Sequence, residues 1–232
     1  PTPEFIQRAL RDASNSPSYP VTAGTPELRA AIKKWAIERL GATGDFDVLP
    51  IIGSKELVAW LPTYLESQTV LIPEIAYPTY HVGAVLAGAK SVPVAIDAHN
   101  WPAADLAWLN SPSNPTGRVH SVDEVKACIQ WARANKAVLI SDECYLEFDQ
   151  NAHSVSVLSQ TGGDNTNILA VHSLSKRSSM AGYRAAFMVG DSALIARIRE
   201  IRKHGGMMVS LPVQKAMTVA LADDVHVSEQ RA

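Results

Sequence analysis

The sequence predicts an α/β protein in which helices flank a mostly parallel central sheet. Five short and almost purely apolar runs predict strands that are buried on both faces, as strands of parallel sheets usually are. They lie at residues 69–72, 106–109, 137–140, 168–171 and 185–189. Helical segments lie between several of these runs, and alternation of this kind is typical of a layered α/β structure.

The first helix is predicted to begin after Thr25. Thr25 suits an N-cap, and Pro26 suits the first helical position, where its missing N–H costs nothing. Apolar residues then recur near the helical spacing until Gly41 ends the run. They are Leu28, Ile32, Trp35 and Ile37.

A capping box predicts the start of a second helix. Ser121 and Glu124 have the spacing that lets each side chain bond the other's backbone N–H, directly after turn residues 115–117. The apolar positions of this helix are Val125, Cys128, Ile129 and Ala132. The strand at residues 137–140 follows it at once.

Composition excludes several classes of function. The chain has 232 residues, 47% hydrophobic and 19% charged, which is enough for a substantial core. Its net charge is −2 and it has no basic stripe, so we expect no nucleic-acid partner. No apolar run approaches the roughly 20 residues of a membrane span, and the first residues do not resemble a signal peptide. We expect a cytoplasmic protein without a membrane partner, with Cys128 and Cys144 reduced.

Three chemically suggestive residues follow predicted strands. Asn114, Asp142 and Lys176 would lie near the carboxyl ends of strands, where open α/β sheets bind ligands. Lys176 stands among serines, as expected of a lysine that forms a Schiff base with a phosphorylated aldehyde cofactor. Each residue also has a plainer interpretation: a solvated lysine, a charged turn at residues 142–143, or an ordinary Asn-Pro-Thr-Gly turn.

The sequence does not match the motifs of other catalytic or ligand-binding classes. Ser173 and Lys176 fit the S-x-x-K signature of serine acylases, but the S-D-N and K-T-G elements of those enzymes are missing. The sequence has neither a G-x-G-x-x-G nor a Walker pattern, which excludes the common nucleotide sites. Its seven histidines lack metal-ligand spacing, so we expect no metal.

Five segments, in chain order, resemble the motifs of class I aminotransferases of fold type I. They are residues 53–56, 76–80, 110–117, 141–145 and 173–176. The resemblance implies the large domain of that fold, which binds pyridoxal 5′-phosphate (PLP), and an enzyme that passes nitrogen from an amino-acid donor to a 2-oxo acid acceptor. Residues 53–62, 171–178 and 202–208 are further similar to actinobacterial N-succinyldiaminopimelate aminotransferases.

The resemblance also implies roles around the cofactor ring. Lys176 matches the lysine that binds the cofactor covalently and then moves the substrate proton. Asp142 matches the carboxylate that keeps the pyridine nitrogen protonated, and Asn114 and Tyr145 match the pair that bonds the phenolic oxygen. Tyr77 matches the aromatic residue stacked on the ring, although an ordinary packed tyrosine is its plainer interpretation.

The resemblance implies a phosphate site built from separate segments. Ser54 and Lys55 would open a helix whose free N–H groups and dipole favour the phosphate. Ser173 would add a hydroxyl, and Arg184 matches an arginine that forks onto the phosphate. Tyr19 matches a tyrosine lent to the phosphate of the partner subunit, so the resemblance implies a homodimer.

By the same resemblance, residues 1–24 form an N-terminal arm that reaches the partner subunit and residues 25–232 form the PLP-binding large domain. The C-terminal small domain, which carries the arginine for the substrate α-carboxylate, is expected to be absent from this chain. The connections near Gln68 and Asn100 are shorter than those of the family.

The expected reaction is transamination between N-succinyl-LL-2,6-diaminopimelate and 2-oxoglutarate in lysine biosynthesis. A PLP-dependent C–S β-lyase and an aminotransferase for another amino acid share every cofactor contact named above. A non-catalytic sensor domain with the aminotransferase fold is a further alternative, although no helix-turn-helix or basic segment supports it.

Overall fold

A computed structural model describes residues 1–149 and 153–231. Within these residues, seven strands form one sheet in the order β1-β7-β6-β5-β4-β2-β3. The strands are β1 (Asp47–Ile52), β2 (Thr69–Pro73), β3 (Lys90–Val94), β4 (Leu106–Asn110), β5 (Val138–Asp142), β6 (Ile168–Ser173) and β7 (Ala185–Gly190). Strands β2 to β6 pair in parallel, whereas β7 is antiparallel to both β1 and β6. The predicted α/β class with a mostly parallel sheet is confirmed.

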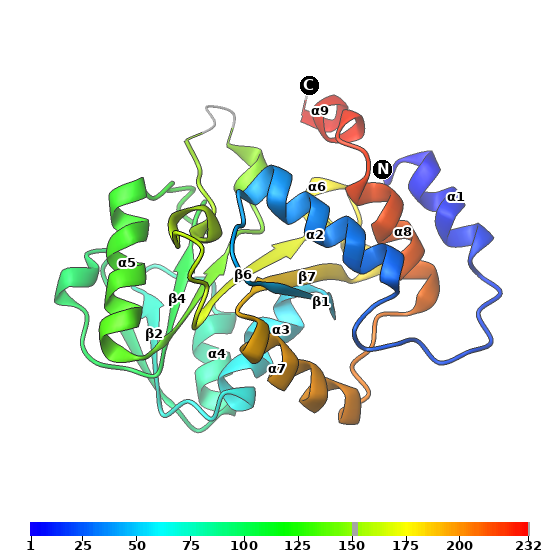
Figure 1. Cartoon of the computed structure of the whole chain (residues 1–232). Helices are drawn as coiled ribbons and strands as arrows, with labels where there is room; N and C mark the ends of the chain where they lie inside the picture. The colour runs from blue at the N-terminus through cyan, green and yellow to red at the C-terminus, as the bar shows by residue number, and fades with distance from the viewer. Residues whose placement is uncertain (150–152, 232) are drawn as a thin grey trace.

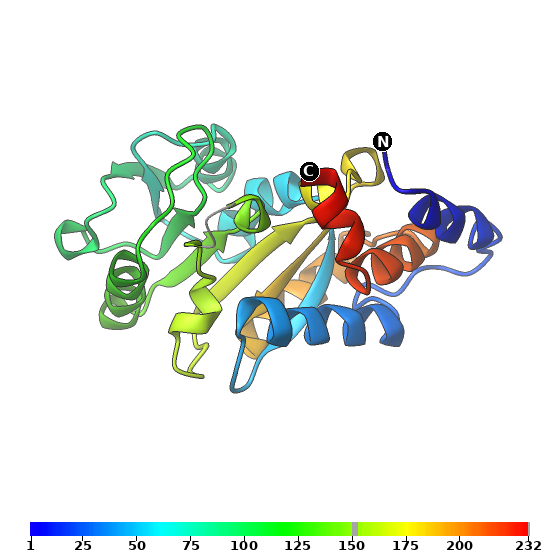
Figure 2. The same cartoon turned by 90° about the horizontal axis from the view of Figure 1, so that it is seen from above.

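Helices cover both faces of the sheet (Figures 1 and 2). They are α1 (Glu4–Asp12), α2 (Pro26–Leu40), α3 (Ser54–Tyr64), α4 (Thr79–Leu86), α5 (Val122–Asn135), α6 (Leu174–Arg177), α7 (Ser192–His204), α8 (Leu211–Leu221) and α9 (Val225–Arg231). Short 3₁₀ helices lie at Ala98–Asn100, Leu146–Phe148, Val157–Gln160 and Ala181–Tyr183. Among the described residues, no helix has both the length and the apolar character needed to cross a membrane.

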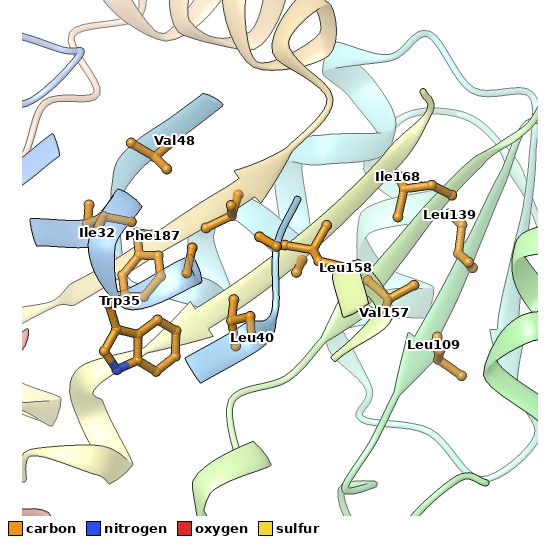
Figure 3. Packing of buried hydrophobic residues seen from close by; sticks show 14 of the residues in the cluster. Ile32, Trp35, Leu40, Val48, Leu109, Leu139, Val157, Leu158, Ile168 and Phe187 are labelled. Carbon is orange, nitrogen blue, oxygen red and sulfur yellow. The ribbon is translucent and has the colours of Figure 1, made fainter. Parts of the chain in front are cut away.

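Successive strand residues contribute to two separate cores. Along β6, Ile168 and Ala170 pack with helices α2, α5 and α8, whereas Leu169 and Val171 pack with α3, α4 and α7. Figure 3 shows the first core, where Trp35 of α2 meets Phe187 of β7 edge to face, with ring centroids 5.4 Å apart. This alternation follows from the pleat of the strands and explains why their sequences are continuously apolar.

The predicted first helix is confirmed as α2, with one wrong position. Thr25 caps it by accepting a 3.2 Å hydrogen bond from the Leu28 N–H, and Gly41 ends it in the left-handed region at φ 65°. Ile37 is 55% exposed instead of buried. A residue two positions beyond Trp35 lies on a different face of a helix, so Ala36 and Leu40 complete the buried stripe.

The capping box of the second helix is confirmed at the start of α5. The Glu124 N–H donates to Ser121 Oγ at 3.2 Å, and the Ser121 N–H donates to Glu124 Oε2 at 2.9 Å. All five predicted strands are also present. Strands β1 and β3 were not predicted. Each is an edge strand that contains a proline, Pro50 or Pro93, because only an edge tolerates the missing N–H.

The first 24 residues are only partly separate from the rest of the chain. Helix α1 packs against α8 of the same chain, and Ile6 is fully buried there. Tyr19, in the extended segment between α1 and α2, is 92% exposed. That this segment reaches a partner subunit stays a prediction, and so does the domain boundary at residue 25.

Candidate active site

A cavity of about 580 Å³ lies at the carboxyl ends of the central strands. The parallel register places Asn110 of β4 beside Asp142 of β5, and Asp142 beside Val171 of β6. Strand ends therefore bring together residues that are far apart in sequence. The cavity is lined by Ser54, Lys55, Tyr77, Asn114, Asp142, Cys144, Tyr145, Ser173, Ser175, Lys176, Ala181 and Arg184. Every residue predicted for the site except Tyr19 is among them.

Asp142 provides a buried carboxylate held by two donors. It ends β5 and is 7% exposed. Its Oδ2 accepts a 2.8 Å hydrogen bond from the Tyr80 hydroxyl, and its Oδ1 accepts one of 3.2 Å from the Cys144 N–H. Burial and then the neighbouring carboxylate raise the pKa of Tyr80 well above its usual value, so the phenol stays a donor. The orientation of the Asp142 carboxylate is thereby fixed.

Asn110 holds the loop that carries Asn114. Its Oδ1 accepts a 2.7 Å hydrogen bond from the Asn114 N–H, and its Nδ2 donates to the Asp142 carbonyl oxygen at 2.9 Å. On the far side, a ring nitrogen of His120 lies 3.1 Å from the Asn110 carbonyl oxygen. Since Asn110 is 2% exposed, these contacts are shielded from water and tie the Asn114 loop to β5.

Lys176 is carried by the short helix α6, directly after β6. Ser173 caps this helix by accepting a 3.1 Å hydrogen bond from the Ser175 N–H. The Lys176 side chain is exposed, and its Nζ lies 6.0 Å from the centre of the Tyr145 ring. Burial raises the pKa of Tyr145, followed by the influence of Cys144 and Asp142, so its hydroxyl stays protonated. An amine and a phenol thus share one wall of the cavity.

A second group of residues around the cavity is suited to an anion. Helix α3 begins at Ser54, and no side chain caps its first turn. Gly53 precedes it at φ 75°, and a Cβ built there would lie 2.7 Å from Cζ of Arg184. The guanidinium therefore lies against the open N-terminus of the helix. Uncapped N–H groups, the helix dipole and a guanidinium together favour a phosphate.

Tyr77 and Lys55 also line the cavity. The Tyr77 ring meets Tyr80 edge to face with centroids 5.8 Å apart, and the Lys55 Nζ lies 5.7 Å from the Tyr77 centroid. Tyr77 is partly exposed, so one ring face is available to a flat ligand.

Several residues of the site were not predicted from the sequence. Tyr80 and Asn110 lie within segments 76–80 and 110–117, but nothing in their spacing signals a bond to Asp142 or to Asn114. Cys144 lines the cavity as a neutral thiol, because burial and then Asp142 raise its pKa well above the usual value, although a hydrogen bond from Ser54 opposes this. Both cysteines are free.

The arrangement suits a flat, phosphorylated ligand with a basic ring nitrogen and a group that reacts with an amine. Asp142 can hold the nitrogen, Lys176 can supply the amine, and Arg184 with the start of α3 can hold the phosphate. Across residues 1–149 and 153–231, no cluster of three or more histidine, cysteine or acidic side chains is placed to bind a metal.

Comparisons with known proteins agree with this chemistry. The family described as aminotransferase class I and II matches residues 1–232. The chain is 49% identical to the 4-dedimethylamino-4-oxo-anhydrotetracycline transaminase of Streptomyces rimosus, over 99% of the chain and 66% of that protein. It is 50% identical to a probable aminotransferase of Mycobacterium tuberculosis, over 100% of the chain and 57% of the relative. The chain therefore spans only part of the length of these relatives.

A solved structure shares the fold. It is a probable N-succinyldiaminopimelate aminotransferase from Thermus thermophilus, which superposes with a TM-score of 0.91 at 27% identity. The match covers 100% of this chain and 68% of the Thermus protein.

Proposed function

Since the chain belongs to the aminotransferase class I and II family, we propose that it is the cofactor-binding part of a transaminase. Members of that family depend on pyridoxal 5′-phosphate, which is therefore the cofactor of this chain. One observation carries the proposal: a single cavity is lined by a buried carboxylate, a lysine, an aromatic ring and an arginine beside an uncapped helix.

The residues of the cavity fit this cofactor. Gly53 is the most specific point, because any side chain there would occupy the space of the Arg184 guanidinium beside the first turn of α3. The donors beside Gly53 match a phosphate, and Asp142 matches a pyridinium. We assign the phosphate to Ser54, Lys55, Ser173 and Arg184, and the ring to Tyr77, Asn114, Asp142 and Tyr145.

When bound, the cofactor supplies an electron sink for the bond that breaks at the substrate Cα. The chain supplies position and proton transfer. The Lys176 Nζ takes the proton from Cα of the bound amino donor, Asp142 holds a positive charge at the ring nitrogen, and Asn114 and Tyr145 hold the ring edge. Because Tyr80 and Asn110 fix Asp142 and the Asn114 loop, little reorganisation is required at these contacts.

We propose N-succinyl-LL-2,6-diaminopimelate as the amino donor and 2-oxoglutarate as the acceptor, in lysine biosynthesis. The resemblance of residues 53–62, 171–178 and 202–208 supports this choice, as does the name of the Thermus structure. The Streptomyces relative is named for a tetracycline intermediate. Its higher identity makes transamination of a different substrate the second candidate.

We also propose a homodimer with the segment around Tyr19 as its reaching arm. The observation that favours it is the 92% exposure of Tyr19, together with the 59% exposure of Val21 in the same extended stretch. Two large apolar side chains exposed two positions apart suit an apolar contact with another surface. We also propose a cytoplasmic location, as expected from the sequence.

A donor panel tests the proposed reaction. The full gene product is incubated with 2-oxoglutarate and either N-succinyl-LL-2,6-diaminopimelate, LL-2,6-diaminopimelate or a set of other amino acids, and glutamate is measured. We expect glutamate to form fastest with the succinylated donor. Pyruvate and ammonia released from a cysteine conjugate without any 2-oxo acid would instead identify a C–S β-lyase. Cofactor binding without either reaction would favour a sensor domain.

A further inference from the structure

Arg177 directly follows Lys176 but is oriented away from the cavity. Its side chain is 5% exposed, whereas the Lys176 side chain is exposed. A buried guanidinium requires acceptors that replace its hydration. Only about 10 Å³ of space remains between Arg177 and its neighbours Trp35, Glu143 and His172, so the side chain is closely confined.

The partners of Arg177 come from segments on two sides. Its Nε forms an ion pair with Glu147, at 2.7 Å from Oε2 but without hydrogen-bond geometry, in the 3₁₀ helix that follows Tyr145. Its Nη2 lies 2.6 Å from Asp224 Oδ1, and its Nη1 donates to the Ala220 carbonyl oxygen at 2.7 Å. One side chain thus joins the Lys176 turn to the Tyr145 segment and to the end of α8.

A second set of contacts holds the same turn. The Ser178 Oγ lies 3.1 Å from Arg177 Nη1 and 2.9 Å from Nε2 of His226 in α9. The other ring nitrogen of His226 lies 2.6 Å from Asp223 Oδ1. The turn after Lys176 is therefore fixed to the segment that links α8 and α9.

Arg177 and Glu147 are close in sequence to two residues that line the cavity. Lys176 and Tyr145 both line it, and the amine lies 6.0 Å from the ring centre. Arg177 is one residue beyond Lys176, and Glu147 is two residues beyond Tyr145. The buried Arg177–Glu147 pair therefore connects the two segments whose spacing sets the distance between Lys176 and Tyr145.

We propose that Arg177 is a positioning residue, which sets the place of the Lys176 amine by fixing its turn to the Tyr145 segment and to the end of α8. The proposal rests on the proposed role of Lys176. It adds that this guanidinium, beside the Ser178–His226 contact, transmits the packing of α8 and α9 to the cavity, and that a lysine could not replace it. An ammonium can satisfy only some of the acceptors that a planar fork reaches together.

The test compares Arg177→Gln, Arg177→Lys and Glu147→Gln with Arg39→Gln as the matched control. Arg39 approaches the same acidic groups from α2, with Nη2 3.4 Å from Glu147 Oε1 and Nε 3.9 Å from Asp224 Oδ2, and is 43% exposed. Arg39→Gln therefore removes a similar charge without changing a residue that contacts the Lys176 turn. Glu147→Gln removes one acidic partner of Arg177, and it tests the proposal if Arg177→Gln does not fold.

Two readouts are independent of turnover. In cofactor-free protein, we expect amide hydrogen exchange of residues 174–179 to be about tenfold faster in Arg177→Gln and Glu147→Gln, as for a segment that loses a buried charged partner. With cofactor bound, we expect the pH dependence of its absorption spectrum to shift in the same variants. Arg177→Lys should lie between them and the wild type, and Arg39→Gln should match the wild type.

Kinetics give the third readout. We expect kcat to fall about tenfold in Arg177→Gln while KM stays within about twofold, because the lost contact orients a reacting group. Unchanged exchange and spectra in Arg177→Gln, or equal changes in Arg39→Gln, would overturn the positioning role. If the wild-type protein forms no borohydride-stable adduct with pyridoxal 5′-phosphate, the proposed function fails, whereas the exchange result still judges the Arg177 contacts.

Discussion

The Tyr80 hydroxyl donates a 2.8 Å hydrogen bond to Oδ2 of Asp142, and both side chains are buried. Tyr80 comes from α4 on one face of the sheet, and its ring stacks on Trp108 of β4 with centroids 4.9 Å apart. Because the phenol stays protonated, the bond always runs from Tyr80 to the carboxylate. Among the described residues, Asp142 is the one buried carboxylate that lines the cavity, and α4 therefore orients it.

Tyr80→Phe should lower turnover while cofactor remains bound. A lost hydrogen bond to a charged group corresponds to a roughly tenfold slower reaction if it is needed in the transition state. Single-turnover kinetics with saturating donor measure the effect. Tyr77→Phe is the control, because it keeps the ring proposed to stack on the cofactor. Wild-type rates in Tyr80→Phe would show that Asp142 needs no help from α4.

Lys176→Ala should abolish covalent attachment of the cofactor, since the substitution removes the proposed reacting amine. Borohydride reduction followed by intact-mass spectrometry detects the attachment. Lys55→Ala is the matched control, because Lys55 also lines the cavity but interacts with the Tyr77 ring. If reduced Lys176→Ala protein still carries the cofactor mass, the lysine is wrongly assigned.

Gly53→Ala should weaken binding of the phosphorylated cofactor. The new Cβ would displace the Arg184 guanidinium, and we expect about tenfold lower affinity for pyridoxal 5′-phosphate from the lost charged contact. Affinity for pyridoxal, which has no phosphate, should change little. Gly88→Ala imposes similar backbone strain at φ 68° with nothing within 4 Å, which makes it the control. An unchanged affinity for pyridoxal 5′-phosphate in Gly53→Ala, or an equal loss of affinity for both ligands, would place the phosphate elsewhere.

Stability should fall as the pH rises from about 9 to about 12. Burial, followed by Glu124, raises the pKa of Cys128 from 9.0 to about 12, and burial, followed by Glu56, raises that of Tyr64 from 10.0 to about 12. Both groups are largely protonated in either state below about pH 8. Above it, the unfolded chain releases protons that the folded chain retains, which favours unfolding.

Urea unfolding at several pH values between 8 and 11 measures this decline. Tyr64→Phe should make the decline above pH 10 shallower, because it removes one of the groups that titrates there only in the unfolded chain. Tyr19→Phe is the control, since that side chain is 92% exposed. A flat stability profile from pH 8 to 11 would contradict the expectation.

The fold was predictable where apolar pattern and capping chemistry agree. Strands buried on both faces gave continuous apolar runs, and α2 and α5 began at residues whose side chains cap them. Strands β1 and β3 were missed because Pro50 and Pro93 argue against a strand until the edge position is known. That position depends on pairing with distant segments, which a single sequence does not reveal.

The candidate site was predictable from motif order, and the structure brings nine predicted residues to one cavity. Their roles stay predictions. The residues that orient them were not foreseen, because Tyr80, Asn110 and Arg177 act through contacts that no spacing rule describes. Tyr19 lies outside the cavity of its own chain, so its role depends on a second copy.

The antiparallel pairing of β1 with β7 has a consequence for biosynthesis. It sets Ile52 opposite Ala185, and so places Gly53 and Ser54 beside Arg184 although most of the chain separates them. A ribosome must therefore release the chain beyond β7 before Arg184 can lie beside the start of α3. Nascent chains that stop earlier have the start of α3 but no guanidinium beside it. A nascent chain can therefore bind a phosphorylated ligand in this way only after β7 has been synthesised and has paired with β1.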